Sequence, residues 1–220
     1  WRALFPIYAL VCLLSISMLA ATPIEEKRPD KASGIMECVR LLGRPFILLC
    51  FIGIMCHVGI DVGTNTTAPK IIIERLGLPL EEAGFATGIY FIFRTGGSLL
   101  GAILLRSVSA KKFFALSVAM MLVAMGILFV SHTIHMIYIG IALIGFGNSN
   151  IFSVIFSQAL NNSPAEQNEV SGLMIMGLFG GTVFPLAMGY ASDFLGGQFG
   201  AVAVMTLGVL YLCLLYTSDA

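Results

Sequence analysis

Long apolar runs alternate with short polar segments along the whole chain. Seven runs are long enough to be membrane helices, at residues of about 3–22, 46–68, 82–105, 113–131, 135–158, 170–191 and 198–216. A helix needs about 20 apolar residues to cross a hydrocarbon core of about 30 Å, and none of the runs alternates like a porin strand. The pattern predicts an all-α integral membrane protein.

Basic residues fall unevenly on the two sides of these spans, which predicts their orientation. One side carries most of the lysines and arginines: Lys27, Arg28, Lys31, Arg40, Arg44, Arg106, Lys111 and Lys112. The other side carries Arg2, Lys70 and Arg75. Because loops rich in lysine and arginine stay in the cytoplasm, the first side is predicted to be cytoplasmic. Trp1 then lies outside and the C-terminus inside.

The order of the spans favours a protein built from two helical bundles. Residues 1–22 are interpreted as the last transmembrane helix of an N-terminal half, and the polar stretch 23–45 as a cytoplasmic linker. Residues 46–216 then form a six-helix C-terminal bundle, and residues 217–220 a doubtful C-terminal end. Some transporters have this plan, with inverted three-helix repeats in each bundle. The sequence begins without methionine, so we expect a missing N-terminal six-helix bundle of the same protein as its partner.

Composition narrows the class of protein further. The chain is 58% hydrophobic and 11% charged, whereas soluble domains carry about 25% charged residues. Formal net charge is zero, so no basic surface for nucleic acid is expected. The sequence contains no recognisable metal-ligand cluster, nucleophile motif or nucleotide-binding glycine loop. We therefore expect a lipid bilayer around the helices, no enzyme activity, and no metal or cofactor.

The second span carries polar groups that are unusual in a membrane helix. His57, Asp61 and Asn65 are spaced i, i+4 and i+8, so they share one helix face. An ionisable group in a membrane helix costs about 2.5–3.5 kcal/mol and usually faces a partner or a watery cavity. This face therefore either lines a substrate cavity or holds Asp61 as the neutraliser of a buried cation.

Two segments at corresponding positions, Gly59–Asn65 and Gly145–Asn150, combine glycines with amides. The glycines and Pro69 are expected to weaken the helix of the second span, which carries the first of these segments. Interrupted helices at corresponding positions of two repeats are typical of a binding site near the membrane midplane. In the second segment, Asn148 and Asn150 are neutral groups suited to sugar hydroxyls. Alternatively they hold helices together, because small and polar residues also pack membrane helices.

Arg94 lies near the centre of the third span, where no neighbour in sequence compensates its charge. An arginine is always ionised and offers five N–H donors in a planar fork. A structural ion pair with Asp61 and direct contact with a substrate are both compatible with this position.

Three stretches resemble one family. GIDVGTNTTAP, the segment from Phe93 to Lys112, and GFGNSNIFSVIFSQAL are similar to the sugar:proton symporters of the major facilitator superfamily, in its fucose, galactose and glucose branch. The resemblance implies the major facilitator fold, with the last helix of the N-terminal bundle followed by the six-helix C-terminal bundle. It also implies a sugar substrate, protons as the coupling ion and coupling carboxylates mostly in the N-terminal half. Residues flanking Asp61 differ from better-known members, which leaves the sugar open.

The sequence thus predicts a multi-pass protein of the bacterial inner membrane. We expect a secondary active transporter that moves a hexose or deoxyhexose by alternating access, coupled to protons. The alternative is an exporter of another small metabolite or drug. The candidate substrate contacts are polar groups of the second, third and fifth spans: Asp61, Asn65, Asn148 and Asn150, then His57 and Arg94.

Overall fold

The computed structural model describes residue 2, residues 4–23 and residues 34–218. The chain divides into two compact units, Trp1–Ser33 and Gly34–Ala220. Residues 24–33 of the predicted linker and residues 219–220 of the predicted end lie outside the described residues. The first unit holds one apolar helix, α1 (Leu4–Ala21), which buries no residue within that unit. Its composition suits a helix surrounded by lipid or by other helices.

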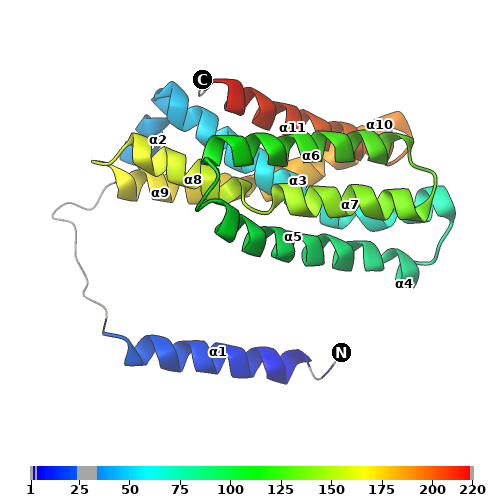
Figure 1. Ribbon diagram of the computed structural model, residues 1–220, viewed down its shortest axis with the longest axis horizontal. Coiled ribbons are helices and arrows are strands. Elements are labelled where there is room, and N and C mark those ends of the chain that lie inside the picture. Colours follow the sequence, from blue (N-terminus) through cyan, green and yellow to red (C-terminus); the bar gives the residue numbers. More distant parts are fainter. Residues whose placement is uncertain (1, 3, 24–33, 219–220) are drawn as a thin grey trace. The chain divides into compact units, whose positions relative to one another are not determined.

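All elements of the second unit are helical: α2 (Ile35–Arg40), η1 (Leu41–Gly43), α3 (Pro45–Leu76), α4 (Leu80–Ala83), α5 (Phe85–Leu104), α6 (Ala110–Val130), α7 (Ile134–Asn148), α8 (Ile151–Asn162), α9 (Gln167–Met176), η2 (Gly177–Phe179), α10 (Gly180–Leu195) and α11 (Phe199–Ser218). The long helices run side by side in one bundle (Figure 1). Apolar side chains such as Ile54, Ile144 and Val209 fill its core with no exposed surface.

Six helical segments of the described residues are long and apolar enough to cross a membrane: Leu4–Ala21, Pro45–Leu76, Leu80–Leu104, Ala110–Val130, Ile134–Asn162 and Gln167–Leu195. A shorter apolar helix covers Phe199–Leu215. Each of these coincides with one of the predicted spans. The prediction of an all-α membrane fold is confirmed.

Helix α3 is the centre of the second unit. It contacts α5, α7, α8, α10 and α11, and it also contacts the short elements at its two ends. The expected interruption of this helix was wrong: α3 is continuous over 32 residues, with Pro69 inside it. Proline removes one backbone hydrogen bond, but the helix is packed by neighbours along its length. Gly59 and Gly63 serve that packing, because a Cβ there would meet the side chains of Phe184 and Met188.

The fifth and sixth spans are the ones that break. The fifth divides into α7 and α8, with Ser149 and Asn150 between them in turn conformation. The sixth divides into α9 and α10 through the short 3-10 helix η2, which begins at Gly177. Gly177 and Gly180 lie at this division, the first at the start of η2 and the second at the start of α10. The second predicted interrupted helix, at Asn148–Asn150, is therefore present, although its expected counterpart in α3 is not.

The last turn of α3 holds the ends of two other helices. Glu74 Oε2 accepts a hydrogen bond of 2.8 Å from the backbone N–H of Gln198, just before α11 begins. Arg75 donates from Nη1 to the carbonyl oxygens of Leu128, at 2.6 Å, and Ser131, at 2.9 Å, where α6 ends. An anion at a helix N-terminus and a cation at a helix C-terminus are both favourable. Two adjacent residues thus fix α6 and α11 against α3.

Replacing Arg75 with methionine should destabilise this end of the bundle. The variant keeps an apolar stem but removes both bonds to the α6 carbonyls, and hydrogen bonds to charged groups contribute about 1.5–3 kcal/mol each. We expect a lower unfolding temperature of the purified protein, measured by intrinsic fluorescence. Lys70→Met, which removes a charge from an exposed position of the same helix, is the control. Equal unfolding temperatures for the two variants would contradict a capping role for Arg75.

Candidate functional site

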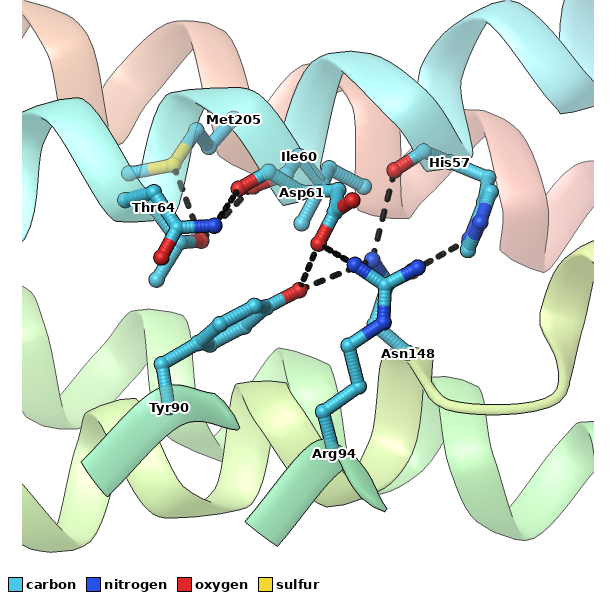
Figure 2. A network of polar contacts seen from close by, with 9 residues as sticks. His57, Ile60, Asp61, Thr64, Tyr90, Arg94, Asn148 and Met205 are labelled. Carbon is cyan, nitrogen blue, oxygen red and sulfur yellow. Dashed lines mark hydrogen bonds and ion pairs between the residues drawn. The ribbon is translucent and has the colours of Figure 1, made fainter. Parts of the chain in front are cut away.

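A polar network crosses the interior of the bundle at the middle of α3. Asp61 lies midway between Pro45 and Leu76, the two ends of that helix. One oxygen of its carboxylate, Oδ1, accepts hydrogen bonds from the Tyr90 hydroxyl and from Nη1 of Arg94 (Figure 2). Tyr90 and Arg94 lie one turn apart on α5, so one face of that helix presents both donors. The cation expected for Asp61 is therefore Arg94.

The network continues from Tyr90 to α7. The side-chain amide nitrogen of Asn148 donates to the Tyr90 hydroxyl, at 3.4 Å, and to the backbone carbonyl of His57, at 3.3 Å. Because this nitrogen faces two acceptors, the amide oxygen Oδ1 faces Nδ1 of His57, at 2.8 Å. Nδ1 of His57 is therefore the protonated ring nitrogen and donates. Every hydrogen-bonding atom of the Asn148 side chain has a protein partner.

Close helix packing makes these contacts possible. Gly145 lies three residues before Asn148 on the same face of α7, and a Cβ there would lie 2.6 Å from the backbone oxygen of Tyr90. Only glycine lets the two backbones approach this closely. Gly145, the first of the two glycines in the Gly145–Asn150 segment, thus sets the distance at which Asn148 reaches Tyr90.

The two ends of the network differ in accessibility. His57 is 2% exposed, and Asn148 and Tyr90 are fully buried. In contrast, the side chains of Asp61 and Arg94 are 19% and 27% exposed. The second carboxylate oxygen of Asp61, Oδ2, accepts no hydrogen bond from the described residues. The network has a buried end that joins three helices and a charged end whose side chains are partly exposed.

The two remaining predicted contacts lie beside this network. Asn65 donates from Nδ2 to the backbone oxygen of Asp61, at 2.9 Å, while its buried Oδ1 has no partner among the described residues. Asn150 donates from Nδ2 to the backbone oxygen of Gly97 on α5, at 2.9 Å, and to Ser149. Asn65 therefore extends the Asp61 face by one turn, whereas Asn150 holds the break between α7 and α8 against α5.

The structure thus brings four of the six predicted residues into one network: His57, Asp61, Arg94 and Asn148. Sequence reasoning did not include Tyr90 among the site residues. A tyrosine one turn from a mid-span arginine is the signal that would have found it. Buried tyrosine hydroxyls usually have a hydrogen-bond partner.

A separate cavity of about 390 Å³ lies between the ends of α3, α6, α8 and α11. Its lining includes Phe46, Lys111 and Gln158, which do not belong to the polar network. We give more weight to the network as a candidate site, since its carboxylate and guanidinium are paired in the bundle interior.

Comparison with known proteins decides the family. The sequence matches the profile of the Major Facilitator Superfamily over residues 1–185 and, in a second overlapping match, over residues 50–220. This chain belongs to the Major Facilitator Superfamily. The resemblance inferred from the three sequence stretches is confirmed, and the chain is a multi-pass membrane protein.

Named members of the superfamily are among its relatives. The chain is 25% identical over 193 residues to the glucose/galactose transporter of Brucella abortus biovar 1 (strain 9-941). This alignment covers 84% of the chain and 45% of that transporter. The fold of this chain also matches the crystal structure of a superfamily transporter, FucP, in the outward conformation, with a TM-score of 0.82 and 17% sequence identity. The match covers 98% of this chain and 53% of the FucP chain. A second structure, of the E. coli fucose:proton symporter FucP, has a TM-score of 0.81 and 18% identity, and covers 100% of this chain and 55% of that one. The chain spans about half the length of these proteins, which are transporters rather than enzymes.

Proposed function

We propose that a transporter containing this chain moves a hexose or deoxyhexose across the cytoplasmic membrane by alternating access, coupled to protons. The partly exposed Asp61–Arg94 ion pair, in the middle of membrane-spanning helices, carries this proposal. Polar groups at that depth usually face a cavity or a transport pathway. The named relatives transport glucose, galactose or fucose, and one of them is a proton symporter.

The chemistry of the charged end suits a sugar. Oδ2 of Asp61 can accept from one sugar hydroxyl, and the N–H groups of Arg94 other than Nη1 can donate to a neighbouring hydroxyl oxygen. Charge-assisted hydrogen bonds of this kind are shorter and roughly twice as strong as neutral ones. Neighbouring hydroxyls of a sugar both donate and accept, so they can satisfy both groups at once. An apolar drug would offer no hydrogen-bond partner to Oδ2 of Asp61 or to the remaining N–H groups of Arg94.

Asn65 supports the same arrangement. Its Oδ1 is an acceptor one helical turn from Asp61, about 6 Å along α3, and it has no protein donor among the described residues. A buried acceptor without a donor costs about 1–3 kcal/mol. Because this oxygen is buried, a second sugar hydroxyl would satisfy it only after the Asn65 side chain rotates toward the Asp61 face. Asn148 and His57 then act as the support that positions α3 and α5, since their bonds are made within the protein.

Uptake in cells tests the proposal. The full-length transporter should be expressed in bacteria that lack their own hexose uptake and supplied with labelled glucose, galactose or fucose. We expect one of these sugars to accumulate and to leave the cells when a protonophore collapses the proton gradient. Accumulation that resists the protonophore would refute proton coupling. Faster loss of preloaded substrate from expressing cells would instead favour an exporter.

A further inference from the structure

Tyr90 is the one side chain among the described residues that hydrogen-bonds both to Asp61 and to Asn148. Its hydroxyl donates to Asp61 at the accessible end and accepts from Asn148 at the buried end. Asn148 is the last residue of α7, directly before the break that precedes α8. The Tyr90 hydroxyl therefore joins the ion pair directly to the end of the broken helix.

The face of α5 that carries Tyr90 also contacts the break between α7 and α8. Tyr90, Arg94, Gly97 and Gly101 follow one another at i, i+4, i+7 and i+11, so they share a helical face. A Cβ at Gly97 would lie 2.7 Å from the Ser149 hydroxyl, and one at Gly101 would overlap the side-chain amide of Asn150. One rigid surface of α5 thus touches Asp61 at one end and the α7–α8 break at the other.

We propose that Tyr90 is a coupling residue, whose hydroxyl makes the break between α7 and α8 respond to occupancy of the Asp61–Arg94 pair. When a sugar hydroxyl competes for Asp61 or Arg94, the bonds on Oδ1 rearrange, and the Tyr90 hydroxyl transmits the change to Asn148. The helices on the two sides of the α7–α8 break then rearrange only when the occupancy of the Asp61–Arg94 pair allows it. This inference rests on the proposed function, because it assumes that the pair binds the transported sugar.

A transporter that loses such a link should leak rather than stop. Without the Tyr90 hydroxyl, the broken helix moves whether or not the pair is occupied, so sugar equilibrates across the membrane but is not concentrated. Downhill entry is retained and accumulation is lost. A purely structural defect would lower both in parallel.

Tyr90→Phe in the full-length transporter tests the inference. It removes one hydroxyl and keeps the buried ring. The control is Tyr211→Phe, which removes a hydroxyl that donates to the Leu49 backbone oxygen at 3.1 Å, between α11 and α3 and outside the network. In proteoliposomes, the readouts are accumulation driven by a proton gradient and counterflow exchange without one. For Tyr90→Phe we expect exchange to persist, so that the ratio of accumulation to exchange falls relative to the wild-type protein. Accumulation should fall by about 5-fold to 150-fold, the range of typical coupling between sites.

Other results separate the two hypotheses. If the wild-type protein transports no sugar, the proposed function fails. If it transports and Tyr90→Phe accumulates sugar as Tyr211→Phe does, the coupling role alone fails. A parallel fall in exchange and accumulation also overturns it. Asn148→Ala cuts the link at its other end and should reproduce the loss of accumulation with retained exchange. If neither variant reaches the membrane, the network is structural and the inference is wrong.

Discussion

Replacing Arg94 with methionine should abolish sugar uptake, and so should replacing Asp61 with asparagine. Arg94→Met leaves the Asp61 carboxylate in the bundle with the Tyr90 hydroxyl as its remaining described partner. Removing one partner of a fully buried ion pair costs about 3–5 kcal/mol, because the other charge is left uncompensated; this pair is partly exposed, so the cost is smaller. We therefore expect each single variant to lose uptake and to reach the membrane in lower amounts than the wild-type protein.

The double variant separates a structural pair from a binding site. Asp61→Asn with Arg94→Met removes both charges, so the protein should return to the membrane at about the wild-type level. If the pair also binds the substrate, uptake stays absent although the protein is present. Asp193→Asn is the matched control, because it removes a carboxylate from an exposed position on α10. Membrane amounts are measured by immunoblot and uptake with labelled sugar. A double variant that transports normally would reduce the pair to a structural contact.

The ion pair was foreseeable as one of two alternatives. Asp61 and Arg94 each lie near the middle of an apolar span, and an unpaired charge there is too costly to leave alone. The sequence could not decide between pairing and substrate contact, because that depends on the distance between α3 and α5. Gly145 in turn sets the distance between α5 and α7, and its close contact with Tyr90 brings α7 into the same network.

Whether α3 is continuous or interrupted could not be predicted from its residues alone. Gly59, Gly63 and Pro69 each weaken an isolated helix, and the expectation of a break followed from them. In the bundle, the same glycines admit Phe184 and Met188 from α10, and this packing outweighs the local preference. Near Asn150 the predicted interruption does occur. There the asparagine lies in the turn between α7 and α8 and donates a hydrogen bond to the carbonyl oxygen of Gly97.

The amides were harder to assign than the charges. Asn148 and Asn150 were predicted to face the substrate, with helix packing as the alternative. The bonds described here join both to protein groups of α3 or α5. Asn65, in contrast, retains an acceptor without a partner among the described residues. An amide can serve a ligand or a neighbouring helix equally well, and only the positions of other backbones distinguish these roles.

Gly180→Ala should destabilise the protein more than any other exchange of glycine for alanine on α10. A Cβ at Gly180 would overlap the carbonyl oxygen, the carbonyl carbon and the Cα atom of Met55 on α3. Backbone atoms cannot rotate away from such a contact as side chains do. Overpacking typically costs about 1–3 kcal/mol, equivalent to about 2–12 °C in unfolding temperature for a chain of this size. Gly189→Ala is the matched control: no atom lies within 4 Å of its added Cβ, and alanine favours a helix interior by about 0.5–1 kcal/mol over glycine. Thermal unfolding of the purified proteins should therefore place Gly180→Ala below the wild type and Gly189→Ala at or above it. Equal unfolding temperatures for the two variants would mean that α3 and α10 do not pack as closely as Gly180 and Met55 indicate.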